Sequence, residues 1–126
     1  LYHQPTIDAQ GTMGFRGVTT NPPLSLQAVQ VDPAGWRQKV LDIAAADPAL
    51  DVEGVYWAMY LDLVKQGADA IRPVWEASGG KFGFLSGQVD PRFVTDGDRM
   101  LAQGLSIAAQ GPNVMVKLPG SKEGYE

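Results

Sequence analysis

The stretch Asn113-Val114-Met115-Val116-Lys117-Leu118 predicts a short β-strand, because it is mostly apolar and lies between two Gly/Pro turns. Side chains alternate between the two faces of a strand, and both faces of this one are apolar apart from Lys117. A strand that is apolar on both faces is typical of a parallel sheet covered by helices. The segment therefore predicts an α/β fold.

Lys117 is the unusual residue of this strand, since a charged amine fits poorly in a buried run. Two explanations are open from the segment alone. The side chain can reach solvent from the end of the strand, or it can be held away from water for chemistry. Desolvation favours the neutral amine, which is the form that attacks a ketone.

With 44% hydrophobic and 19% charged residues, the composition is typical of a soluble globular protein, and we expect one domain over residues 1–126. A net charge of −4 without a basic patch argues against nucleic acid. The chain has no cysteine, which excludes thiolate zinc sites and cysteine nucleophiles. It has only one histidine, which argues against a Ser-His-Asp catalytic triad. We therefore expect no metal or cofactor. No apolar run has the length of a membrane span, and we expect a cytoplasmic location.

The remaining segments alternate between strand and helix patterns. The longest periodic pattern predicts a helix from Asp51, its N-cap, to Gly67, its C-cap, with its tyrosines in the core. The other predicted elements are a strand within 14–21, helices over 24–29, 36–46 and 68–77, a strand over 82–89, and a helix over 95–109 capped by Thr95.

This order, in which every return between strands is helical, predicts parallel strands as in part of a β/α barrel. In such a barrel the carboxyl ends of the strands converge on the active site. Polar side chains occupy these predicted ends: Thr19, Thr20 and Asn21 on the first strand, Ser86 and Gln88 on the second, and Lys117 on the third. Hydroxyls, amides and one amine at a common edge suggest carbonyl chemistry.

Three segments, in order, resemble motifs of the transaldolase family. They are Gly17-Val18-Thr19-Thr20-Asn21-Pro22, Gln88-Val89-Asp90-Pro91-Arg92 and Val114-Met115-Val116-Lys117-Leu118-Pro119. The resemblance extends over nearly the whole chain from Gly17 onward. It implies a TIM-type β/α barrel and an enzyme of carbohydrate metabolism, in the pentose phosphate pathway, that transfers a dihydroxyacetone unit between sugar phosphates.

The resemblance also implies roles for individual residues. Lys117 matches the lysine that forms a Schiff base with the ketose, and Asn21 and Thr19 match positions that line the pocket for the dihydroxyacetone unit. Gln88 stands where many transaldolases have a glutamate that positions the catalytic water. Because related fructose-6-phosphate aldolases carry a glutamine there, direct aldol cleavage is the alternative reaction. Thr20 is expected to support the turn, and Asp90 to pair with Arg92.

Length sets a further expectation, since a complete β/α barrel needs at least roughly 200 residues. The 126 residues predict the N-terminal half of such a barrel, with the first strand missing or reduced to Leu1-Tyr2. An open half-barrel exposes strand edges, so we expect a homo-oligomer. The alternative to an enzyme is a catalytically inactive fragment that oligomerises.

Overall fold

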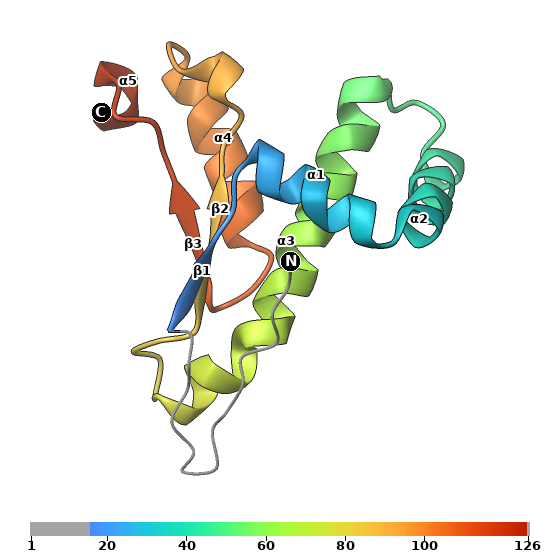
Figure 1. The fold of residues 1–126 in the computed structure, drawn as a ribbon. Helices are drawn as coiled ribbons and strands as arrows, with labels where there is room; N and C mark the ends of the chain where they lie inside the picture. The colour runs from blue at the N-terminus through green and yellow to red at the C-terminus, as the bar shows by residue number, and fades with distance from the viewer. Residues whose placement is uncertain (1–15, 126) are drawn as a thin grey trace.

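The computed structural model describes residues 16–125 and shows an α/β arrangement of three strands and several helices (Figure 1). In chain order the elements are β1 (Gly17–Thr19), α1 (Pro22–Val31), α2 (Pro33–Ala46), α3 (Val52–Ala77), β2 (Phe84–Gln88), the 3₁₀ turn η1 (Pro91–Phe93), α4 (Gly97–Ala108), β3 (Val114–Lys117) and α5 (Lys122–Tyr125).

The three strands form one parallel sheet in the order β1-β2-β3, as the strand and helix pattern predicted. Thr19 pairs with Ser86 across the first ladder, and Gln88 pairs with Lys117 across the second. Helical segments connect each strand to the next. All three carboxyl ends therefore lie at one edge of the sheet, which is the upper edge in Figure 1.

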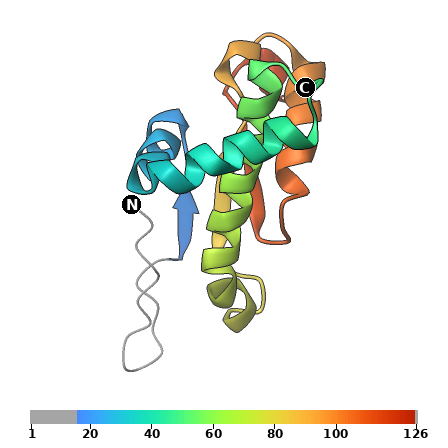
Figure 2. The ribbon, with the colours of Figure 1, turned by 90° about the vertical axis from the view of Figure 1, so that its right-hand side faces the viewer.

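Helices α3 and α4 cover one face of the sheet, and the core lies between them and the strands (Figure 1). Fully buried residues of this core come from α3, from β2 and the residue after it, and from α4, namely Val64, Ala68, Val74, Leu85, Val89 and Ile107. Helix α2 crosses α3 on its outer side, where Trp36 and Leu63 form a second cluster (Figure 2). The opposite face of the sheet has no helix over it among the described residues (Figure 1).

Side-chain caps explain where the helices begin. The carboxylates of Asp32, Asp51 and Asp96 and the amide oxygen of Asn21 each accept a hydrogen bond from a backbone N–H of the first turn. The predicted cap at Asp51 is confirmed. The predicted cap of α4 at Thr95 is wrong, because Asp96 has the extended backbone and its carboxylate accepts the hydrogen bond from the Arg99 N–H. Helix α2 begins at Pro33 rather than Trp36, since proline is well suited to the first helical position.

Helix α3 is a single helix of 26 residues, so the predicted end at Gly67 is wrong. Gly67 does not adopt the left-handed conformation of a C-cap; it lies buried inside the helix, followed by the fully buried Ala68. Ala68 belongs to the core between α3 and the sheet. The helix ends instead at Ser78, before Gly79 and Gly80, both of which have positive φ.

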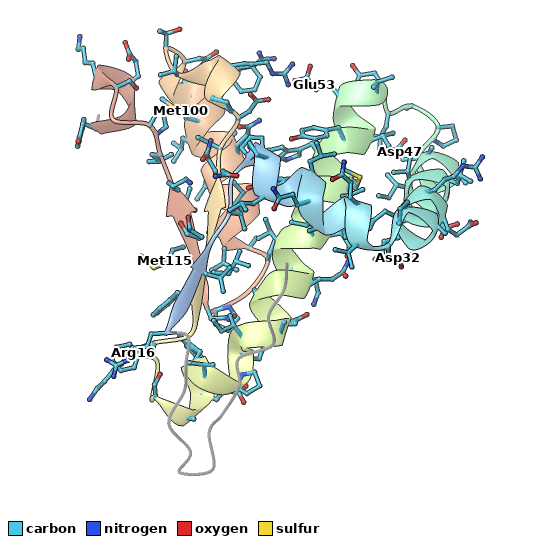
Figure 3. The ribbon with its side chains drawn as sticks, viewed as in Figure 1. Arg16, Asp32, Asp47, Glu53, Met100 and Met115 are labelled. Atoms are coloured by element: carbon cyan, nitrogen blue, oxygen red, sulfur yellow. The ribbon has the colours of Figure 1, made fainter. Side chains whose placement is uncertain are left out.

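The prediction that both faces of β3 are buried is wrong, because Met115 is exposed. Its side chain is 53% exposed and points away from α3 (Figure 3). Val114 and Val116, on the other face, pack against the core. The face that carries Met115 and Lys117 is therefore the open face of the sheet.

Two further expectations from the sequence concern a first strand and membrane spans. The expected first strand at Leu1-Tyr2 lies outside the described residues. Between residues 16 and 125, no helix is long and apolar enough to cross a membrane.

Candidate functional site

Gln88 and Lys117 are neighbours at the carboxyl edge of the sheet. They are register partners in the parallel ladder of β2 and β3, and both side chains lie on the open face. Neighbouring strands are about 4.8 Å apart, so the two side chains start side by side. Thr19 lies on the same face of β1, two residues before the level of Gln88, and is exposed. The structure thus brings three of the four predicted site residues onto one surface.

The Lys117 amine has a defined place. Its Nζ donates a hydrogen bond of 2.8 Å to the backbone carbonyl of Thr20, in a partly buried position. That carbonyl follows the last residue of β1, so the side chain extends from β3 over the end of β2. Within residues 16–125, Lys117 forms no ion pair with a carboxylate. A single backbone acceptor therefore orients the amine.

Asn21 follows β1 directly and serves as the N-cap of α1. Its Oδ1 accepts a hydrogen bond of 2.8 Å from the backbone N–H of Leu24, which fixes the orientation of the amide. In this structure Asn21 therefore has a capping role in the turn between β1 and α1. The amide nitrogen makes no hydrogen bond within the described residues and remains able to donate to a ligand.

Thr20 and Tyr60 form a buried polar link behind this edge. Thr20 is 5% exposed, and its Oγ1 donates to the backbone carbonyl of Ser86 at 2.9 Å, as expected for a residue that supports the turn. The Tyr60 hydroxyl donates to the backbone carbonyl of Gln88 at 3.0 Å and accepts from the Gln88 N–H at 2.8 Å.

Sequence reasoning assigned Tyr60 only to the core, where it does lie with 5% exposure. The hydrogen bonds of the Tyr60 hydroxyl to the backbone of Gln88 were not predicted. One signal was present, because a buried tyrosine usually finds a hydrogen-bond partner that phenylalanine would not need.

An ion-pair cluster borders the site at the turn after β2. Asp90 and Arg92 form the expected ion pair, with Arg92 Nη2 2.5 Å from Asp90 Oδ2, and Arg92 also reaches Glu53. Hydrogen bonds from Arg92 hold the pKa of the Asp90 carboxyl below its usual value. Burial, followed by the nearby Asp90 charge, raises the pKa of the Tyr56 hydroxyl, which stays protonated at neutral pH.

Cavities do not enclose the candidate site. One of about 280 Å³ is lined by Gln88, Tyr60 and Arg92 among others but not by Lys117. Another, of about 930 Å³ between α4 and α5, touches none of the four predicted site residues. Within residues 16–125, no group of three or more Asp, Glu, His or Cys side chains lies close enough together to hold a metal ion. The chemistry available at this surface is that of an amine, amides and a hydroxyl.

Comparison with known proteins identifies one family. Residues 6–126 match the family described as Transaldolase/Fructose-6-phosphate aldolase. The chain is 37% identical to Transaldolase 1 of Streptomyces avermitilis over 86% of its own length, and 34% identical to the transaldolase of Kocuria rhizophila over 96%. It is 31% identical to the transaldolase of Mycobacterium ulcerans, also over 96%. These matches span only 28–32% of the relatives' own length.

Proposed function

The chain belongs to the transaldolase/fructose-6-phosphate aldolase family, and on this premise we propose that it carries the Schiff-base lysine of a transaldolase. The complete enzyme would transfer a dihydroxyacetone unit between sugar phosphates. The observation that carries the proposal is the placement of Lys117 beside Gln88 at the carboxyl edge of a parallel sheet. Active sites of β/α barrels are built at that edge.

Lys117 is the proposed nucleophile. Its neutral amine adds to the ketose carbonyl and, with loss of water, forms an iminium ion that draws electrons from the neighbouring carbon–carbon bond. The hydrogen bond to the Thr20 carbonyl supports this role, because it holds the end of a long, flexible side chain in one place. Closure of the open face by further strands would supply the desolvation that favours the neutral amine.

We propose that three further residues bind the substrate and orient the water molecule: Asn21, Thr19 and Gln88. The amide nitrogen of Asn21 can donate to a substrate hydroxyl, and the exposed Thr19 lies on the open face with Gln88 and Lys117. Gln88 can orient a water molecule through its carboxamide, but it cannot accept that water's proton.

Borohydride trapping tests the nucleophile. Incubation of the full-length protein with fructose 6-phosphate and borohydride should add mass to the peptide that contains Lys117, and Lys117→Met should abolish the addition. Lys81→Met is the matched control, since Lys81 is exposed near the opposite end of β2 and should leave trapping unchanged. Mass added at another lysine, with Lys117 unmodified, would refute the assignment.

Transfer and direct aldol cleavage are the two reactions to separate. The relatives above are named transaldolases, which favours transfer, whereas Gln88 is the residue that motivated the cleavage alternative. We expect Gln88→Glu to raise the ratio of transfer to cleavage, because a carboxylate adds a proton acceptor beside the water. An unchanged ratio would show that position 88 does not select the reaction.

The three strands are proposed to form part of a β/α barrel, and a location in the cytoplasm stays a prediction. Residues 1–126 alone should associate with further copies and show no turnover, since the open face leaves Met115 and the strand edges exposed. Sedimentation as a stable monomer, or turnover by this chain alone, would contradict these two expectations respectively.

A further inference from the structure

Tyr60 completes hydrogen bonds that the sheet leaves open at Gln88. Strand β1 ends at Thr19, and the last bond of its ladder runs from the Thr20 N–H to the Ser86 carbonyl. In a parallel strand, alternate residues direct their backbone groups to the same neighbour. The N–H and C=O of Gln88 therefore face the side where β1 has already turned into α1.

The Tyr60 hydroxyl fills this gap. It accepts from the Gln88 N–H at 2.8 Å and donates to the Gln88 carbonyl at 3.0 Å, so one side chain makes both bonds that another residue of β1 would have made. The ring is held in the core and contacts Trp57, with 5.4 Å between ring centroids. A rigid aromatic side chain on α3 thus fixes the backbone of the residue whose carboxamide lies at the candidate site.

The Tyr60 hydroxyl also lies next to Thr20, the residue whose backbone carbonyl binds Lys117. Tyr60 Oη is 3.5 Å from Thr20 Oγ1, and each of the two hydroxyls has a backbone carbonyl at a shorter distance that takes its hydrogen. The two side chains therefore pack without competing for a proton. The backbone carbonyl of Thr20 accepts the hydrogen bond from Lys117 Nζ.

We propose that Tyr60 is a positioning residue that sets the location of the Gln88 carboxamide and, through Thr20, of the Lys117 amine. This inference rests on the proposed Schiff-base function. Tyr60 touches neither substrate nor reacting atoms in this role. Loss of its hydroxyl leaves two partly buried backbone groups of Gln88 without this partner, and water entry or a shift of the strand end would then satisfy them.

The test is Tyr60→Phe in the full-length protein, with Tyr56→Phe as the matched control. Tyr56 lies one turn earlier on α3 and makes no hydrogen bond to β2 within the described residues. We expect Tyr60→Phe to lower kcat about tenfold to a hundredfold, as small misplacements of reacting groups do. KM should change little, and Tyr56→Phe should be close to wild type.

A double-mutant cycle with Gln88→Ala separates positioning from general destabilisation. If Tyr60 acts through Gln88, Tyr60→Phe should cost much less kcat in the Gln88→Ala background than in wild type. Equal costs in both backgrounds, or wild-type kcat for Tyr60→Phe, would overturn the inference. If Tyr60→Phe does not fold, Thr20→Val removes the neighbouring hydroxyl at similar shape, and its kcat must fall in the same way.

Different results would overturn the proposed Schiff-base function and the proposed role of Tyr60. Absence of borohydride trapping at Lys117 in the wild type would overturn the proposed function. Normal trapping at Lys117 in the wild type, together with equal kcat values for Tyr60→Phe and Tyr56→Phe, would overturn only the role of Tyr60.

Discussion

Gly87 lies on β2 against Ile107 of α4 and Val64 of α3, and its replacement by alanine should destabilise the protein. A Cβ at this position would come within 2.6 Å of Ile107 Cγ2 on α4 and within 3.5 Å of Val64 Cγ2 on α3. Ordinary carbon contacts are about 3.5–4.0 Å. The strand or Ile107 must therefore move by roughly 1 Å. Neither Ile107 nor Val64 has any exposed surface, so no space is free to take up this movement.

The expected change in the free energy of unfolding is the sum of two opposing contributions. Overpacking of a tight core costs about 1–3 kcal/mol, whereas replacing a strand glycine with alanine returns about 0.5–1 kcal/mol of backbone entropy. We expect a net loss of about 1–2 kcal/mol in the free energy of unfolding. With m-values of about 1–3 kcal/mol per molar urea, the unfolding midpoint should fall by roughly 0.3–2 M.

Gly104→Ala is the control, because Gly104 is also buried but its added Cβ would lie 3.4 Å from Val116 Cγ1, close to an ordinary contact. Alanine is about 1 kcal/mol better than glycine inside a helix. Urea unfolding followed by circular dichroism should therefore place Gly104→Ala at or above wild type. A Gly87→Ala midpoint equal to that of wild type, or an equal fall in both variants, would refute the packing argument.

Two further predictions concern hydrogen bonds and charge. Asn113→Ala should lower the free energy of unfolding by about 1–3 kcal/mol, because the fully buried Asn113 donates to the Gly83 carbonyl at 3.0 Å; a change below about 0.5 kcal/mol in urea unfolding would contradict this. Asp90→Asn should be less stable than wild type at neutral pH, and the difference should become smaller as the pH falls below about 4, because Arg92 lowers the pKa of Asp90. The sign follows from a folded-state pKa below the unfolded value of about 3.9, so the stability is present above about pH 4 and lost as pH falls through the folded pKa. Thermal unfolding from pH 7 to pH 3 measures it, and a constant difference would argue against the ion pair.

Local patterns in the sequence predicted most of the strands and helices of this fold and the edge of the sheet at which the candidate site residues Gln88 and Lys117 lie. The apolar run around Lys117 predicted a parallel strand, and the alternation of strands and helices predicted that its carboxyl end meets those of the other two. The Asp51 cap and the Asp90–Arg92 pair were also predicted, since each depends on residues at most three positions apart. Short-range physics of this kind is fully present in the sequence.

Only the tertiary structure decided which atoms meet across the sheet. The partner of Lys117 Nζ is a backbone carbonyl 97 residues away, and the partners of the Tyr60 hydroxyl are 28 residues away. The exposure of Met115 and the continuation of α3 past Gly67 also depend on how closely the helices approach the strands. A sequence pattern predicts which residues favour a strand or a helix, but the register and the distance between packed elements decide which of their polar groups face one another, because hydrogen bonds form only within about 3 Å.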